Sequence, residues 1–286
     1  MAPTTRRRAP TTLGAALAGT AALPAARARA LGGHRGLRPL RHAHAHNDYD
    51  HPRPLLDALD HRFGSVEADV FLVGDRLLIG HAAELDPART LESLHLDPLA
   101  ARVRANRGRV YRGWHRSVQL LVDIKTEGSS AYRELDRHLR RHPHLFTTCA
   151  RGRVHPGPVT VVVSGDRAAR APMEAQGERR AFHDGRLTDL GSAAPASFAP
   201  LISDNRTLHF TWQGEGPFPD AERRKLRSIA GAAHAHGQRV RFRATPDTPG
   251  PARDALSTEL LATGVDFPNT DDLAGLEAFP DARPSA

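Results

Sequence analysis

Cysteine is almost absent from this chain, in which Cys149 is the single one among 286 residues. One cysteine excludes an intramolecular disulfide framework and any zinc site built from clustered cysteines. We therefore expect core burial to hold the chain together. The length favours one large domain over several small modules stapled by disulfides.

Long apolar runs are also scarce. The uncharged stretch from Thr11 to Ala25 is too short, and its side chains too small, to predict a membrane span. It follows the basic residues Arg6–Arg8 and precedes Ala28–Ala30, which has the A-x-A form of a cleavage site. We expect residues 1–30 to be an export signal for the general secretory or twin-arginine route, and the mature protein to be secreted. A disordered, alanine-rich N-terminus is the alternative.

Acidic residues are fewer than lysines and arginines. The resulting formal net charge of +8 is typical of nucleic-acid-binding proteins. However, residues 1–30 contain five arginines and no acidic residue. The rest of the chain has no basic run with interleaved aromatic residues, which is the pattern that single-stranded nucleic acid requires. We expect no nucleic-acid partner, and we expect the mature protein to be a monomer.

Strand-like and helix-like segments alternate along residues 31–280, which predicts a single α/β domain. The predicted strands are Leu37–His46, Ser65–Asp69, Val118–Ile124, Val159–Ser164, Arg180–His183, Leu201–Ser203, Arg239–Ala244 and Val265–Asn269. The predicted helices are Pro54–Arg62, Ser130–Arg141, Asp220–His236 and Ala252–Thr263. Eight strands with intervening helices predict a (β/α)₈ TIM barrel, with an irregular barrel as the variant because the fifth and sixth strands are weak. No glycine-rich phosphate loop follows the first strand, which argues against a doubly wound sheet. Residues 281–286 are expected to fray.

The second predicted strand, in the segment S-V-E-A-D-V, contains two acidic residues. Side chains alternate along a strand, so Glu67 and Asp69 share one face. Two carboxylates on a strand suited to burial cost several kcal/mol unless a cation meets them. A divalent cation with oxygen ligands would satisfy both, and two exposed acids on an edge strand are the alternative.

A hairpin is predicted directly after this strand. Residues 70–79 form two apolar arms around Gly74-Asp75, a two-residue turn of the Gly-X type. The returning arm ends at Gly80-His81. We therefore expect His81 to lie close to the two carboxylates.

The third predicted strand turns charged at its carboxyl end, where barrel enzymes place their chemistry. Asp123 and Lys125 share a face by the same period of two. A structural salt bridge between them is the alternative. Together with the carboxylates of the preceding strand, Asp123 would complete an oxygen-rich site.

Histidine is concentrated in residues 42–51, H-A-H-A-H-N-D-Y-D-H. Alternation places His42, His44 and His46 on one strand face, and three histidines on one face could bind zinc. The acidic residues downstream are instead ligands suited to Mg²⁺ or Ca²⁺. We expect His46, at the strand end, to take part in the chemistry, and His42 and His44 to line the interior or lie on the surface.

These motifs, H-N-D-Y, S-V-E-A-D-V, G-H, L-V-D-I-K and T-D-D, resemble the phosphatidylinositol-phospholipase-C-like phosphodiesterase superfamily. The resemblance is to the glycerophosphodiester phosphodiesterase-like branch that includes altered inheritance of mitochondria protein six. It runs from about His44 to Leu276 and implies a TIM barrel, one divalent cation (Mg²⁺ or Ca²⁺) and a small phosphodiester or phospholipid substrate. The implied roles are acid-base catalysis by His46 and His81, or nucleophilic attack on phosphorus by one of them. The resemblance also implies metal binding by Glu67, Asp69 and Asp123, and substrate binding by Asn47 and Lys125.

Three departures from the family pattern leave alternatives open. Asn47 stands where relatives have arginine, Ala82 where many have an acid, and Arg243 where an aromatic residue is expected. The attacking group is water, or a substrate hydroxyl that would produce a cyclic phosphate as in a lyase. A barrel that binds phosphate ligands without catalysis is a further alternative.

Overall fold

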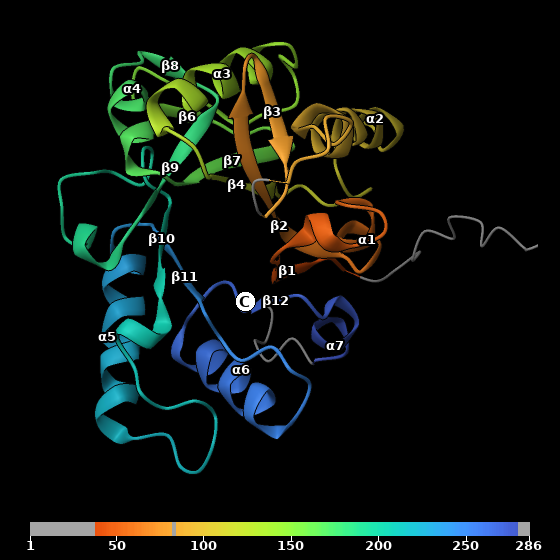
Figure 1. The fold of residues 1–286 in the computed structure, drawn as a ribbon. Helices are drawn as coiled ribbons and strands as arrows, with labels where there is room; N and C mark the ends of the chain where they lie inside the picture. Colours follow the sequence, from red (N-terminus) through yellow and green to blue (C-terminus); the bar gives the residue numbers. More distant parts are fainter. Residues whose placement is uncertain (1–37, 82–83, 280–286) are drawn as a thin grey trace, which may run out of the picture. The chain divides into compact units, whose positions relative to one another are not determined.

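The strands of the computed structural model, which describes residues 38–81 and 84–279, follow the order expected of a TIM barrel. Eight parallel strands lie side by side in the order β1, β2, β4, β7, β9, β10, β11 from orange to blue in Figure 1, with β12 on the free side of β1. Their bounds are β1 Leu40–Ala45, β2 Phe63–Val73, β4 Val118–Ile124, β7 Val159–Gly165, β9 Ala181–Gly185, β10 Leu201–Asn205, β11 Arg239–Arg243 and β12 Asn269–Thr270. The predicted export signal and the tail at 281–286 lie outside the described residues.

The barrel is nearly closed by its first and last strands. Asn269 of β12 lies opposite His44 of β1 in a parallel pair. A single parallel bridge between Arg241 and Phe267 joins β11 to the residues just before β12. The predicted (β/α)₈ barrel is therefore confirmed.

The barrel is irregular because its strand connections differ in kind. The α-helices are α1 Leu56–Asp60, α2 Asp97–Ala105, α3 Gly128–Arg140, α4 Arg170–Glu174, α5 Asp220–Ala235, α6 Pro251–Thr263 and α7 Leu273–Ala278. The connection between β9 and β10 contains only a three-residue 3₁₀ helix at Leu187–Asp189. This segment is rich in alanine, serine and proline, as expected for a loop.

Additional strands decorate the barrel. β3 (Arg76–Ile79) pairs antiparallel with the end of β2, which confirms the predicted hairpin. A separate three-stranded sheet of β5 (Thr148–Ala150), β6 (Arg153–His155) and β8 (Glu178–Arg179) was not predicted. Its strands are too short for their alternation to be recognised, and all residues of β6 are exposed. The predicted eighth strand at Val265–Asn269 is observed only as the two-residue β12.

Apolar side chains form separate layers outside and inside the strands. Outside, Val66, Val122 and Val163 belong to one buried cluster with Leu135 of α3. Inside, Leu121, Val162, Phe182, Leu201 and Phe267 form a second buried cluster with Cys149. The barrel interior therefore has an apolar middle, and the polar residues on the same strand faces lie towards its two ends. Among residues 38–81 and 84–279, no helix is long and apolar enough to cross a membrane.

Candidate active site

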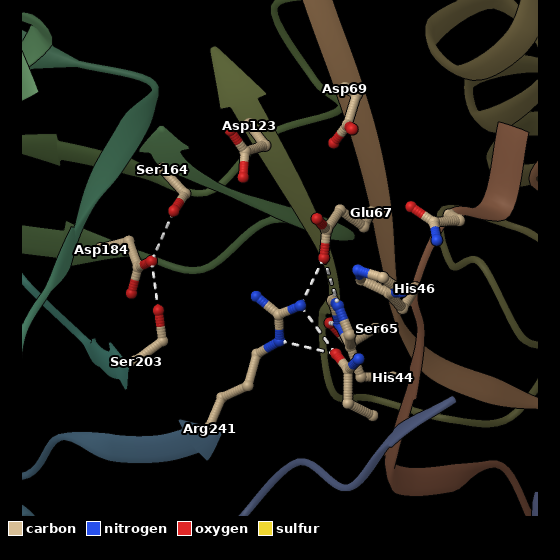
Figure 2. Close-up of polar contacts among 12 residues, drawn as sticks. His44, His46, Ser65, Glu67, Asp69, Asp123, Ser164, Asp184, Ser203 and Arg241 are labelled. Carbon is tan, nitrogen blue, oxygen red and sulfur yellow. Dashed lines mark hydrogen bonds and ion pairs between the residues drawn. The ribbon is translucent and has the colours of Figure 1, made fainter. Parts of the chain in front are cut away.

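The predicted acidic residues meet inside the carboxyl end of the barrel. Glu67 and Asp69 lie on β2, and Asp69 pairs in register with Asp123 of the neighbouring β4. One carboxylate oxygen from each of the three lies within 4.8 Å of the others. Figure 2 shows the three side chains directed towards one another from two strands.

These three carboxylates have the properties of a site for a hard divalent cation. Glu67 and Asp69 are only 3% and 1% exposed, so solvent does not compensate their charge. Oδ1 of Asp69 is buried and has no hydrogen-bond partner among the described residues. Oxygen donors of this kind are preferred by Mg²⁺ and Ca²⁺, so the donor set fits the predicted cation.

Lys125 contributes a fixed positive charge to the same cluster. Its Nζ lies 3.1 Å from Oδ2 of Asp69 and 3.3 Å from Oδ1 of Asp123. Burial and the nearby Glu67 carboxylate nevertheless raise the pKa of Asp69, and burial also raises the pKa of Asp123. Lys125 therefore does not fully compensate the two aspartates, and an added cation would stabilise their ionised forms.

Glu67 is held by two partners that the sequence patterns did not indicate. Nη2 of Arg241, on β11, donates to Oε2 of Glu67 at 2.5 Å. Nε2 of His44 donates to the same oxygen at 2.9 Å. Figure 2 shows both side chains reaching the same oxygen of Glu67. Although burial opposes ionisation, Arg241 and His44 hold the pKa of Glu67 well below its ordinary range.

His44 is an interior residue, so its assignment to the barrel lining is confirmed and a surface position is excluded. It is fully buried, and burial followed by the charge of Arg241 lowers its pKa to about 3. The ring is therefore neutral. Because its Nε2 proton is directed to Glu67, Nδ1 accepts from the hydroxyl of Ser65 at 2.7 Å.

His46, the first predicted catalytic histidine, lies just after β1 and is paired with an acidic residue. Its Nδ1 lies 2.9 Å from Oδ1 of Asp271. Burial alone would lower the pKa of His46, but the hydrogen bond to Asp271 raises it above its ordinary value. Asn47 lies at the same place in a left-handed conformation (φ 43°), and its Nδ2 donates to the other oxygen of Asp271 at 3.3 Å.

His81, the second predicted catalytic histidine, is delivered by the β2–β3 hairpin to the carboxylates, as expected. Its Nδ1 lies 3.5 Å from Oδ2 of Asp69 and 2.9 Å from the hydroxyl of Tyr49. The same hydroxyl lies 2.9 Å from Oδ2 of Asp69, which can only accept. The hydroxyl also lies 2.7 Å from Oδ1 of Asn47, so Tyr49 donates its one proton to Asn47 or Asp69 and accepts from Nδ1 of His81. In the neutral ring, Nε2 of His81 then carries no proton.

The histidines do not form a three-histidine zinc site. Nδ1 of His42 lies 2.8 Å from the backbone oxygen of Asp266, whereas the two nitrogens of His44 are directed to Ser65 and Glu67. Within the described part of the chain, the groups that could hold a metal ion do not include His42, His44 and His46 together.

A second polar cluster lies on the strands β7, β9 and β10 at the same barrel end and was not predicted. Oδ2 of the fully buried Asp184 accepts hydrogen bonds from Ser164 at 2.7 Å and Ser203 at 2.5 Å (Figure 2). It also accepts one from Arg186 at 2.8 Å. Ser164 is the register partner of Asp123, so this cluster adjoins the carboxylates. Its hydroxyls and carboxylate are suited to contact polar groups of a ligand.

The missed residues share a reason. Tyr49, Asp184, Arg241 and Asp271 act through partners more than fifteen positions away along the chain, which a single strand pattern cannot reveal. A signal was available for Arg241, because the segment R-V-R-F-R alternates charged and apolar residues. Its charged face is the barrel interior.

Comparisons with known proteins identify a family and several relatives. Residues 34–184 match the AIM6-like phosphodiesterase domain. The altered inheritance of mitochondria protein 6 homolog of Arthroderma benhamiae is 27% identical over 274 residues, covering 86% of this chain and 85% of the relative. The altered inheritance of mitochondria protein 6 of Eremothecium gossypii is 28% identical over 270 residues, covering 84% and 69%. That of Saccharomyces cerevisiae strain S288c is 25% identical over 270 residues, covering 80% and 68%.

Proposed function

The chain belongs to the AIM6-like phosphodiesterase family, and we propose that it is a metal-dependent phosphoric diester hydrolase. Its proposed substrates are glycerophosphodiesters or phospholipid headgroups. The observation that carries this proposal is the meeting of Glu67, Asp69 and Asp123 beside Lys125 at the barrel end where His46 and His81 lie.

The proposed cation is Mg²⁺ or Ca²⁺, held by Glu67, Asp69 and Asp123. When bound, it would neutralise charge on the non-bridging oxygens of the phosphodiester. Nζ of Lys125 would bind one of these oxygens, since it already lies within 3.3 Å of both aspartates. Arg241 and His44 would act on the substrate only indirectly, by fixing the position of Glu67.

The two histidines would divide the proton transfers. His46 has a raised pKa because of Asp271, so it is suited to donate a proton to the leaving alkoxide. Nε2 of His81 is left free to accept the proton of the attacking hydroxyl, because Nδ1 is directed to Tyr49. The attacking group is water or, in the lyase variant, a hydroxyl of the substrate.

A second function is supported by one contact. Arg241, paired with Glu67 at 2.5 Å, adds a guanidinium to the carboxylate cluster that Lys125 also contacts. Two such cations could bind a phosphate group without hydrolysing it, as in a catalytically silent phosphate-binding barrel. Chelator-sensitive turnover by the purified protein would exclude this alternative.

The test is hydrolysis by the purified chain with Mg²⁺, Ca²⁺ or EDTA. The substrates are bis(p-nitrophenyl) phosphate, glycerophosphocholine, lysophosphatidylcholine and sphingomyelin. We expect His46→Ala and His81→Ala each to lower turnover by about 10²–10⁴-fold, the usual contribution of acid-base catalysis. The matched control is His236→Ala, because His236 is an exposed histidine at the end of α5. Retention of more than about a tenth of the activity by both variants would contradict the proposal.

Export of the chain is a separate proposal, based on residues 1–30. Expression of the full chain with its signal is expected to give a secreted protein that begins near Leu31, after the A-x-A site. Mass spectrometry of the N-terminus in the culture medium tests this. Recovery of the uncut chain from the cells alone would refute it.

A further inference from the structure

A cavity of about 390 Å³ opens at the end of the barrel opposite the carboxylates. Its wall includes Arg41 and His42 near the start of β1, Gly64 near the start of β2, Val118 of β4 and Arg239 of β11. It is therefore formed by the amino ends of the strands. The size lies within the range of small-molecule sites, about 300–1,000 Å³.

The cavity wall is strongly basic. The lining contains the cationic or titratable basic residues Arg41, His42, His115, Arg116 and Arg239, and its acidic residue is Asp266. Oδ2 of Asp266 is already bound by the backbone N–H of Val240 at 2.9 Å and by Nε2 of His234 at 2.8 Å. Arg116 and Arg239 outweigh this one carboxylate, so the net charge facing the cavity is positive.

Arg239, on β11, lies in this wall, and the charge of Asp266 acts on it without forming an ion pair. Within residues 38–81 and 84–279, no carboxylate forms an ion pair with Arg239 or Arg116. Nη2 of Arg239 donates to Oε1 of Gln119 at 2.8 Å, and the guanidinium lies 5.0 Å from the ring centroid of Phe267. Burial lowers its pKa to about 10. A bound anion would compensate this desolvated charge.

Flat and apolar side chains complete the wall. Tyr111 and Trp114 lie with ring centroids 6.0 Å apart, and both line the cavity. Phe182 and Phe267 line it from the barrel interior, where they belong to the buried apolar cluster. Such a surface contacts a planar group well, because ring faces stack on planar apolar groups.

We propose that this cavity binds a phosphate monoester carried on a flat apolar group. The guanidiniums of Arg116 and Arg239 would bind the phosphate, since arginine pairs with phosphate oxygens in a bidentate geometry. Two guanidiniums without ion pairs attract a dianionic phosphate more strongly than a singly charged carboxylate. Trp114 would contact the flat group.

The probe is phenyl phosphate, titrated by calorimetry into the full chain in EDTA. The fluorescence of Trp114 is followed in a Trp212→Phe background, where it is the single remaining tryptophan. We expect saturable binding that changes this fluorescence. Arg239→Gln and Arg116→Gln are each expected to weaken binding by roughly tenfold or more, the usual effect of removing a charged hydrogen bond. Arg243→Gln is the matched control, because Arg243 is an exposed arginine at the other end of the same strand.

Each remaining outcome counts against the proposal. Arg116 is exposed, so Arg116→Gln leaves the core intact. Weaker binding by this variant therefore reports the site and not a loss of folding. Absence of saturable binding at millimolar probe, or equal weakening by Arg243→Gln, would overturn the site. Benzoate that binds as tightly as phenyl phosphate would overturn the phosphate assignment, and inorganic phosphate that binds as tightly would overturn the role of the flat group.

Discussion

Replacement of His183 by phenylalanine should change how the stability of the barrel depends on pH. His183 lies on β9, is 3% exposed and stacks on Phe198 with ring centroids 5.5 Å apart. Neither ring nitrogen has a hydrogen-bond partner among the described residues. Burial, assisted by the charges of Arg167 and Arg170, lowers its pKa to about 3. The folded protein therefore keeps this ring neutral at pH values where the unfolded chain protonates it.

The size of the effect follows from the difference between the two pKa values. An unfolded histidine has a pKa of about 6.5, so between pH 6.5 and about pH 3 only the unfolded chain binds this proton. His183 therefore leaves the free energy of unfolding unchanged above pH 6.5. As the pH falls below 6.5, protonation of the unfolded chain lowers the free energy of unfolding progressively. Between pH 7 and pH 5 the loss amounts to about 2 kcal/mol.

The assay is urea unfolding of wild type and His183→Phe at pH 7 and pH 5. The free energy of unfolding should fall less in the variant on acidification, and the difference between the two proteins should be about 2 kcal/mol. Other titrating groups cancel in this comparison. His236→Phe, at an exposed position, should keep the wild-type dependence. Identical pH dependence in wild type and His183→Phe would refute the account of this buried ring.

Two further predictions concern the site. Arg241→Met leaves the buried charge of Glu67 without its cationic partner, so the free energy of unfolding, measured with urea in EDTA, should fall by about 3–5 kcal/mol. A fall below about 1 kcal/mol would contradict the pairing. Asp271→Asn removes the contact that raises the pKa of His46, so the limb of the pH profile of kcat/KM that reports His46 should move to lower pH. An unmoved profile would show that Asp271 does not tune His46.

Much of the fold could be predicted because local patterns reflect the barrel directly. The apolar runs Val118–Ile124 and Val159–Ser164 lie within one residue of the observed strands, since buried parallel strands are continuous apolar segments. The carboxylates of Glu67, Asp69 and Asp123 could be predicted to meet because alternation and strand ends fix where they point.

The remaining parts depend on contacts between distant segments. Glu67 and Arg241 are separated by 174 positions, and their pairing follows from barrel closure rather than from either strand. His44 could be placed on the interior face, but its role in holding Glu67 required the position of β2. The small sheet of β5, β6 and β8 consists of strands of two or three residues, which carry too few side chains to show a period.

Binding of a divalent cation by the three carboxylates tests the proposed function most directly. A crystal of the chain soaked in Mn²⁺ would locate the ion by anomalous scattering. The proposal predicts a peak about 2.0–2.6 Å from oxygens of Glu67, Asp69 and Asp123. No peak there, or an ion bound instead at the other candidate group of Glu92, Asp97 and His142, would contradict it.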